Sequence, residues 1–421
     1  MVALDALVAC LEDGKPLDDV LDRDRRHRML EPRDRALVAT ITAETCRRLG
    51  QIDALVRACL KRPLPKKERV TRAILRLATA QLLFLGFAPH AAVSTAVDLA
   101  RKRANAHAGL VNAILRRLGR EGAAMIAKQD AALLNTPKWL WSSWDTDYGP
   151  ENARAIAESH GRRAALDLSV ASDAVGWAAR LDARLLPTGG LRRTMSGPVD
   201  DLPGYASGGW WVQDAAASLP ARLLGDVASQ HVIDFCAAPG GKTAQLAAAG
   251  ARVTAVDLSE RRLGRLDENM SRLGLTVETV VADAVSWRPD APVDAVLLDA
   301  PCSGTGTIRH HPDIAWTKGP DDPPRLSQLQ ARMIDNALAG LKPGGTLVYA
   351  VCSLQPEEGE AQLARCLERH ADVIQLPVSP DEVGGLTAAV DATGCLRTLP
   401  CHMASDGGMD GFFTMRVKRS T

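Results

Sequence analysis

Two cysteines in the second half of the chain stand where thiol chemistry could occur. Cys302 lies in the string D-A-P-C-S-G-T-G at residues 299–306, and Cys352 follows the apolar string Y-A-V at residues 349–351. Most free cysteines are small buried hydrophobes. Both of these lie in polar, Gly- and Pro-rich loops directly after apolar runs, so we expect a nucleophile or a proton carrier among them.

A glycine-rich turn lies upstream, in the string C-A-A-P-G-G-K-T at residues 236–243. Small residues and paired glycines let a backbone approach a ligand closely at the N-terminus of a helix. A phosphate-binding P-loop would need Gly at the position of Cys236, and the dinucleotide fingerprint G-x-G-x-x-G is absent. The alternatives are a binding loop of another kind and a tight turn without a ligand.

Aspartates follow the next two predicted strands. Asp257 stands sixteen residues after Gly241, and Asp283 follows the strand that ends at Val281. A carboxylate at the first position suits the free hydroxyls of a ribose, and one at the second can accept a hydrogen bond from an exocyclic amine. Each aspartate could instead cap a helix. Three strand ends in succession, each with a suitable group, are a stronger indication of ligand binding than any one of them.

These segments are spaced by strands that alternate with helices, a pattern that indicates an α/β domain with a parallel sheet covered on both faces. In such sheets ligands lie beyond the carboxyl ends of the strands, near the switch in strand order. We predict strands at His231–Phe235, Arg252–Val256, Val277–Val281, Val293–Leu298, Thr346–Val351 and Phe412–Val417. The predicted helices are Lys242–Ala249, Glu260–Leu273, Arg325–Leu341 and Pro356–His370.

The rest of the chain divides into two further parts. Residues 1–125 have apolar residues at three- and four-residue spacing, which predicts an all-helical bundle. Residues 126–211 mix Gly, Pro and Trp and read as a small α+β connector, which leaves residues 212–421 for the α/β domain.

Charge is distributed unevenly along the chain. Residues 1–130 carry 24 Lys and Arg against 15 Asp and Glu, a net charge of +9, and residues 131–421 carry 27 against 35, a net charge of −8. A basic front part suggests a module that binds a polyanion such as nucleic acid. The alternative is a solvated helical surface that is rich in arginine.

The composition also narrows the class of protein. No apolar run is long enough to span a bilayer, and the N-terminal residues lack the pattern of a secretory signal. Nine cysteines, an odd number without a C-x-x-C pair, argue against a disulfide scaffold and a zinc ribbon. We therefore expect a reduced, cytoplasmic protein without membrane contact, and a monomer.

Residues 213–418 resemble the RsmB/Nop/Sun family of RNA 5-cytosine methyltransferases. The strings that carry the resemblance are D-F-C-A-A-P-G-G-K-T, D-A-P-C-S-G-T-G with R-H-H-P-D-I after it, A-V-C-S-L-Q-P-E-E-G-E and D-G-F-F. Residues 31–120 resemble the NusB-like RNA-binding domain that precedes the catalytic domain in bacterial rRNA members, through P-R-D-R-A-L, T-R-A-I-L-R-L-A and G-L-V-N-A-I-L-R-R. The resemblance implies a Rossmann-like class I methyltransferase domain behind an all-α NusB-like domain.

The resemblance also implies roles for individual residues. Cys352 would be the nucleophile, Cys302 would help to release the product, and Asp299 would contact the cytosine ring. The cofactor would be S-adenosyl-L-methionine. The substrate would be rRNA, bound by the basic N-terminal domain and the catalytic cleft. The residues that would hold the cofactor are Cys236, Ala237, Ala238, Pro239, Gly240, Gly241, Lys242, Asp257, Asp283 and Asp299. The chain departs from the pattern at Val351, where many members have Thr.

The chemistry agrees with these roles. Carbon 5 of cytosine is a poor nucleophile, and addition of a thiolate to carbon 6 makes it reactive. A protonated Asp299 could hydrogen-bond ring N3 as charge develops, and Cys302 could remove the carbon 5 proton or assist its removal. The target base must be unpaired or flipped out of a helix. The residue that activates Cys352 is not identifiable from the sequence.

Two other functions remain open at this point. DNA cytosine methyltransferases carry their nucleophile in a Pro-Cys loop after the fourth strand, which here would be Cys302, but the second cysteine and the basic front part favour RNA. A non-enzymatic RNA-binding factor with a vestigial catalytic half would transfer no methyl group. The string R-H-H-P at residues 309–312 could contact phosphate or base, or form a structural turn, and it lacks a suitably spaced third ligand for a metal.

Overall fold

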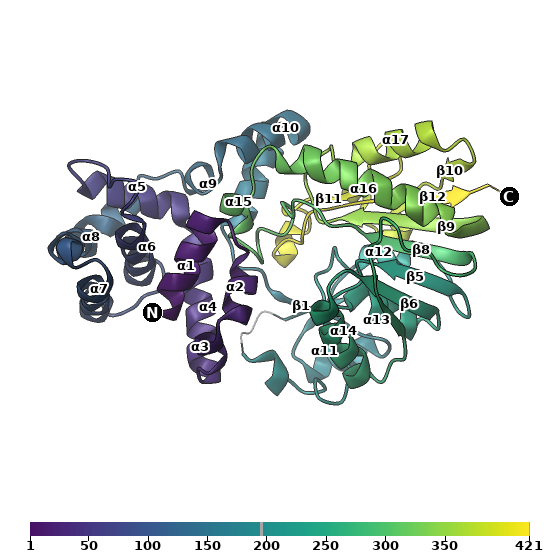
Figure 1. Ribbon diagram of the computed structural model, residues 1–421, viewed down its shortest axis with the longest axis horizontal. Helices are drawn as coiled ribbons and strands as arrows, with labels where there is room; N and C mark the ends of the chain where they lie inside the picture. The colour runs from purple at the N-terminus through teal and green to yellow at the C-terminus, as the bar shows by residue number, and fades with distance from the viewer. Residues whose placement is uncertain (194–196, 421) are drawn as a thin grey trace. The chain divides into compact units, whose positions relative to one another are not determined.

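The computed structural model describes residues 1–193 and 197–420, and they form two compact units (Figure 1). The helical unit consists of Met1–Arg163 and Ile308–Pro320, and the sheet unit consists of Ala164–Thr307 and Asp321–Thr421. Among the described residues, none of the helices combines the length and the apolar character that a membrane crossing needs.

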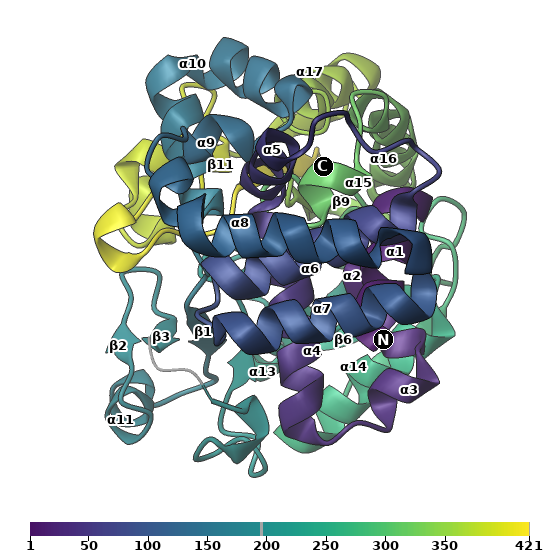
Figure 2. The same ribbon diagram turned by 90° about the vertical axis from the view of Figure 1, so that its left-hand side faces the viewer.

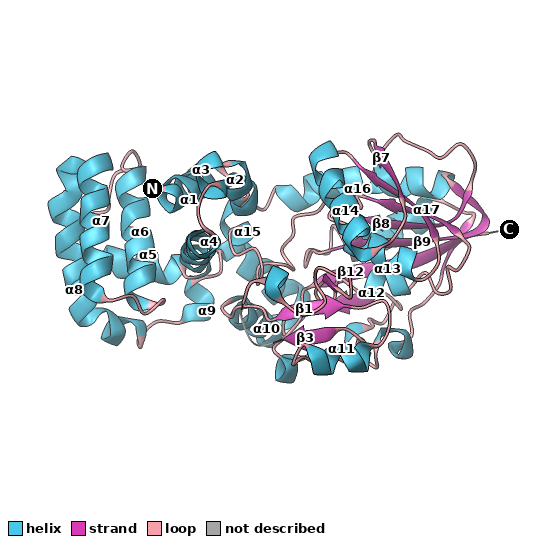
Figure 3. Ribbon diagram, turned by 90° about the horizontal axis from the view of Figure 1, so that it is seen from below, coloured by secondary structure: helices cyan, strands magenta, loops and turns pink. Residues whose placement is uncertain are grey.

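The regular elements of the helical unit are helices (Figure 3). They are α1 (Val2–Asp13), α2 (Leu17–Arg23), α3 (Arg25–Arg28), α4 (Pro32–Arg47), α5 (Leu49–Cys59), α6 (Arg69–Leu83), α7 (Pro89–Arg103), α8 (Ala108–Ile126), α9 (Ala131–Leu134), α10 (Lys138–His160) and α15 (Ile314–Thr317).

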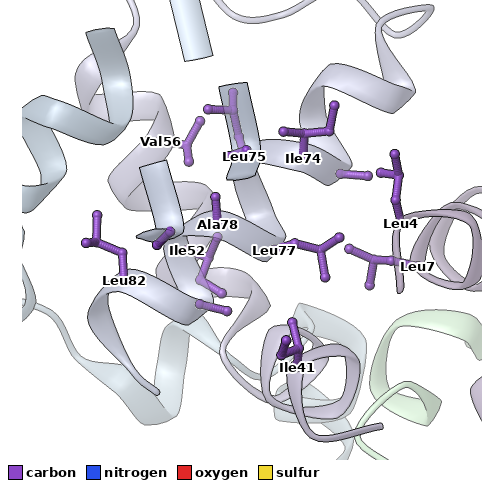
Figure 4. Close-up of a cluster of buried hydrophobic side chains, with 14 of the residues drawn as sticks. Leu4, Leu7, Ile41, Ile52, Val56, Ile74, Leu75, Leu77, Ala78 and Leu82 are labelled. Carbon is purple, nitrogen blue, oxygen red and sulfur yellow. The ribbon is translucent and has the colours of Figure 1, made fainter. Parts of the chain in front are cut away.

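The core of this unit forms because each long helix turns one apolar face inward. Helix α6 buries Ile74 and Leu77 on the side of Leu4 and Leu7 of α1, and Leu75 lies beside Val56 (Figure 4). Such burial is expected of residues at helical spacing. Helices α7 and α8 lie side by side (Figure 2), and the apolar face of α8 continues to Ile126.

One segment of the helical unit comes from the second half of the chain. In residues 308–320, Trp316 packs against the core of the helical unit and its Nε1 donates to the carbonyl oxygen of Cys46 at 2.8 Å. The backbone N–H of Leu17 donates to Oδ2 of Asp313 at 3.0 Å. The chain thus passes from the sheet unit into the helical unit and back between β8 and α16.

The sheet unit holds a large sheet and a small one. The large sheet contains β5 (His231–Phe235), β6 (Arg252–Asp257), β7 (Glu278–Val281), β8 (Val293–Asp299), β9 (Leu341–Val351), β10 (Val373–Gln375), β11 (Leu396–Thr398) and β12 (Phe412–Arg419). Its order is β10-β12-β9-β8-β5-β6-β7, and β11 pairs with β12. Strands β5 to β9 pair in parallel, whereas β12 runs antiparallel to β9.

Helices cover both faces of this sheet (Figure 1). The helices of the unit are α11 (Ala174–Arg180), α12 (Leu219–Arg222), α13 (Gly241–Ala248), α14 (Glu260–Leu273), α16 (Asp322–Ala339) and α17 (Glu360–Arg369). On β5, Ile233 and Phe235 face the cluster formed with α16 and α17, and Val232 faces the cluster formed with α12 and α13. Both faces of this strand are therefore covered, as in other parallel sheets. The predicted α/β fold is confirmed.

The connector predicted over residues 126–211 contributes α9 and α10 to the helical unit and a small sheet to the sheet unit; residues 194–196 lie outside the described residues. That sheet has the order β2-β3-β1-β4, with strands β1 (Leu166–Ser169), β2 (Arg184–Leu185), β3 (Leu191–Arg193) and β4 (Trp211–Val212). A buried ion pair holds it, since Arg192 contacts both oxygens of Asp167 at 2.6 and 2.5 Å.

Candidate active site

The strand order reverses between β5 and β8. From β5 the chain continues outward through β6 and β7, then returns to place β8 on the other side of β5. The loops that leave the carboxyl ends of β5 and β8 therefore meet at the switch point, where open α/β sheets bind ligands. These loops are the predicted glycine-rich turn and the loop that carries Cys302.

The glycine-rich turn has an unusual backbone. Cys236 and Gly240 have positive φ values of 60° and 103°, conformations that disfavour most residues with a Cβ atom. A Cβ atom on Gly240 would lie 2.9 Å from Cγ of Leu266, so the turn packs tightly on α14. The turn delivers Gly241 to the N-terminus of α13.

The two aspartates occupy adjacent strand ends. Asp257 ends β6, and its two oxygens accept hydrogen bonds from the backbone of Ala238 at 3.3 Å and Ser259 at 2.9 Å. Asp283 follows β7, is exposed, and accepts a hydrogen bond from the backbone of Val285 at 2.9 Å. Both carboxylates therefore also shape their own loops, as caps do.

Two buried groups border the turn. Burial raises the pKa of Asp234 to about 7, because a carboxylate in the interior loses its hydration. Its Oδ2 accepts a hydrogen bond from Thr243 at 2.6 Å, and its Oδ1 has no hydrogen-bond partner. Burial also raises the pKa of the Cys236 thiol, with Asp299 and Asp257 acting in the same direction, so Cys236 is held as a neutral thiol.

Lys242 links the turn to the neighbouring loop. Its Nζ donates to Oδ2 of Asp299, the last residue of β8, at 2.7 Å, and lies 5.2 Å from the ring centroid of Phe412. Burial lowers the pKa of the Lys242 ammonium, but Asp299, Asp234 and Cys352 outweigh this effect, and the pKa is raised above its usual value. Lys242 is therefore held in its charged form beside Asp299.

The two predicted cysteines lie together. The Sγ atoms of Cys302 and Cys352 are 3.4 Å apart, both residues are partly exposed, and both are free thiols. The pKa of Cys302 is raised, first by its hydrogen bond with Cys352 and then by burial. Because β8 and β9 are parallel neighbours, their loops bring residues fifty positions apart in the sequence into contact.

The string R-H-H-P lies elsewhere. Residues 309–312 belong to the helical unit. The side chain of Arg309 is 2% exposed, and its carbonyl oxygen accepts a hydrogen bond from Arg47 at 2.9 Å. Nδ1 of His311 lies 3.0 Å from a carboxylate oxygen of Asp18. These contacts favour the structural alternative that the sequence left open.

Sequence reasoning missed Glu358, which is fully buried beside both cysteine loops. It was placed inside a helix predicted from Pro356, and that prediction is wrong because α17 begins at Glu360. Among Glu357, Glu358 and Glu360, nothing in the residue types distinguishes the buried member from the solvated ones. A turn after a helix-breaking Pro356 was the one available signal.

Comparisons with known proteins agree with this geometry. Residues 221–418 match the family described as 16S rRNA methyltransferase RsmB/F, and residues 1–120 match the NusB family. Ribosomal RNA small subunit methyltransferase B of Shigella boydii is 36% identical over 391 residues, covering 88% of this chain and 90% of the relative.

Two solved structures are similar in fold. The crystal structure of PH0851 has a TM-score of 0.75 at 22% identity and covers 99% of this chain and 98% of its own. A methyltransferase homolog from Pyrococcus horikoshii has a TM-score of 0.54 at 27% identity and covers 66% of this chain and 93% of its own. The resemblance found in the sequence is thereby confirmed, and the chain belongs to the RsmB/F family of 16S rRNA methyltransferases, with a NusB-family domain at its N-terminus.

Proposed function

We propose that this protein transfers a methyl group from S-adenosyl-L-methionine to carbon 5 of a cytosine in small-subunit rRNA, through a covalent bond from Cys352 to carbon 6. The observation that carries the proposal is the pair of thiols 3.4 Å apart in the loops that follow β8 and β9. The loop of Cys302 begins at Asp299, which is paired with Lys242 of the glycine-rich turn. One thiol alone could add to the ring, but two are suited to addition and release.

The residues at three adjacent strand ends fit the cofactor. The turn at residues 236–242 offers backbone N–H groups without bulky side chains, and Asp257 and Asp283 offer carboxylates to hydroxyl and amine groups. Asp299 closes this row from β8. When bound there, S-adenosyl-L-methionine supplies an electrophilic methyl group, and the protein supplies its orientation.

Cys352 adds to carbon 6 as a thiolate, since the thiol itself is a weak nucleophile. The ammonium of Lys242 lies within electrostatic reach of this sulfur, because Cys352 is among the groups that raise the pKa of Lys242. Asp299 contacts the cytosine ring and holds Lys242 in place.

Cys302 completes the cycle. The bond between Cys352 and carbon 6 removes the hydrogen bond that is the largest cause of the raised pKa of Cys302. Cys302 then loses its own proton to water more readily and can take the proton from carbon 5. As that proton leaves, its bonding electrons restore the ring double bond, and Cys352 departs with the electron pair of the carbon–sulfur bond.

RNA binding by the helical unit fits its charge. A groove of about 790 Å³ lies between α7 and α8, and its lining includes Val93 and Leu115. Arg101 on its rim is paired with Asp98 at 3.1 Å, whereas Nε of Arg116 donates to the neutral amide of Asn112 at 3.1 Å. Cations without carboxylate partners are free to contact phosphate.

Methyl transfer from labelled cofactor to rRNA, followed by bisulfite mapping of rRNA from cells lacking the protein, tests the proposal. We expect label in one cytosine, lost with Cys352→Ala. Turnover that survives Cys352→Ala but not Cys302→Ala would reverse the two roles, as in the DNA enzymes. Absence of transfer to both naked rRNA and assembled subunits would favour a binding protein.

A further inference from the structure

Glu358 lies in the turn between β9 and α17 and is fully buried. Its Oε1 accepts hydrogen bonds from the backbone N–H of Ser303 at 2.9 Å and from Nε2 of Gln330 at 3.0 Å. Its Oε2 accepts from the hydroxyls of Ser303 at 2.5 Å and Ser353 at 2.6 Å. These donors match the four lone-pair sites of a carboxylate.

The donors identify what this carboxylate connects. Ser303 follows Cys302 in the chain, and Ser353 follows Cys352. A single side chain therefore bonds to the residue next to each thiol. The strand pairing of β8 with β9 ends at Asp299 and Ala350, so beyond that point the sheet no longer fixes the distance between the two loops.

Other contacts join the same loops, but Glu358 is the centre of the network. The hydroxyl of Thr305 accepts from the backbone of Leu354 at 2.9 Å, and the backbone of Gly306 donates to the carbonyl oxygen of Cys352 at 3.0 Å. Tyr349 donates to the carbonyl oxygen of Glu358 at 2.6 Å and fixes the turn itself. Hydrogen bonds to a carboxylate are about twice as strong as neutral ones.

We propose that Glu358 is a positioning residue that sets the distance between the sulfurs of Cys302 and Cys352 by binding both cysteine loops. It does not contact the substrate. Burying a carboxylate is unfavourable unless every oxygen is hydrogen-bonded. The two cysteine loops therefore stay bound to Glu358, and the distance between the sulfurs is the same whether or not RNA is bound. The consequence for catalysis rests on the proposed function, but the geometric role does not.

The proximity of the two thiols can be tested without any activity assay. Phenylarsine oxide bonds to two adjacent thiols at once, and a lone thiol holds it weakly. We expect stoichiometric arsenical to protect Cys302 and Cys352 of the full-length protein from alkylation, with peptide mapping to separate them from the other seven thiols. Cys302→Ala serves as the single-thiol reference.

Glu358→Ala should weaken binding of the arsenical by at least tenfold, so that its affinity approaches that of Cys302→Ala. Glu358→Gln should restore most of the affinity, because its amide can still bond to the serine hydroxyls. If the negative charge of Glu358 were required rather than its hydrogen bonds, Glu358→Gln would bind the arsenical as weakly as Glu358→Ala. If Glu358→Ala does not fold, Ser353→Ala removes the hydrogen bond between Glu358 and the loop of Cys352 and should give an intermediate loss of arsenical affinity.

Asn336→Ala is the matched control. Asn336 is a buried polar residue of α16 in the same unit, which donates to the carbonyl oxygens of Ala284 at 3.0 Å and Trp287 at 2.7 Å. Its loss should lower the melting temperature and leave arsenical binding unchanged. Wild-type affinity in a folded Glu358→Ala protein would overturn the inference. Tight arsenical binding by a wild-type protein that transfers no methyl group would leave it standing and overturn the proposed function.

Discussion

A Cβ atom on Gly306 would lie 1.9 Å from the carbonyl oxygen of Gly411. The backbone N–H of Gly411 donates to the carbonyl oxygen of Gly306 at 2.9 Å. The loop that carries Cys302 is thereby fixed against the residue that precedes Phe412, whose ring contacts Lys242.

Gly306→Ala should therefore cost about 3 kcal/mol of folding free energy or more, because two backbones must separate. Urea denaturation measures this. Gly264→Ala, in α14 with open space around it, is the control and should be neutral or stabilising by up to about 1 kcal/mol. An equal effect of both substitutions would mean that the close approach is not required.

Cys302→Ala should accumulate a covalent protein–RNA adduct, because addition by Cys352 proceeds while release stalls. A denaturing gel with labelled rRNA should show a shifted band for Cys302→Ala, and none for Cys352→Ala or the double variant. Absence of the band in all three would contradict the assignment of the nucleophile.

Product release should accelerate as the pH rises from 7 to 9. In the adduct the hydrogen bond with Cys352 is gone, but burial still raises the pKa of Cys302. The thiol is therefore largely protonated at neutral pH, and below its pKa the thiolate fraction grows about tenfold per pH unit. Single-turnover decay of the adduct measures the rate. A pH-independent rate in the wild type would exclude Cys302 as the base.

Asp234 should make the sheet unit less stable as the pH rises from 4 to 7. Its pKa is about 7 when folded and 3.8 as a free group, so between these values the folded chain retains a proton that the unfolded chain has released. The free energy of unfolding then falls by about 1.4 kcal/mol per pH unit from this group. Denaturation of Asp234→Asn should lack this slope, and parallel curves for the two proteins would refute it.

Arg116→Ala should weaken rRNA binding and flatten its salt dependence. One lost phosphate contact reduces the slope of log K against log salt by about 0.7 to 0.9. Arg69→Ala, an exposed residue of the same unit 3.7 Å from Asp13, is the control. An unchanged slope in Arg116→Ala would show that RNA does not contact Arg116 in the groove between α7 and α8.

Much of the fold could be predicted because local signals and burial agree. The helix predicted at Glu260–Leu273 has the observed ends, since the side chain of Ser259 caps it and Gly274 terminates it in a left-handed conformation. Helix α10 was missed because Gly149, with φ of 80°, and Pro150 interrupt it, and the sequence there reads as a turn.

The site was predictable where residue types are distinctive and not where distance in space decides. Two cysteines were expected just after two strands, and the structure places their Sγ atoms 3.4 Å apart. The ion pair of Lys242 with Asp299 and the burial of Glu358 depend on side-chain directions that no local pattern encodes. Likewise, nothing in the string R-H-H-P-D-I indicates that it packs with helices three hundred residues earlier.

The assignment of residues 308–320 to the helical unit means that the backbone runs between the two units at three places, after Arg163, Thr307 and Pro320. A protease that nicks the first junction would leave the fragments tethered through the other two. Expressing residues 164–421 alone would remove the residues that Trp316 packs against and would expose its indole ring to solvent. Because the helical unit is built from two separate segments of the chain, neither unit can be transferred to another protein as one continuous segment.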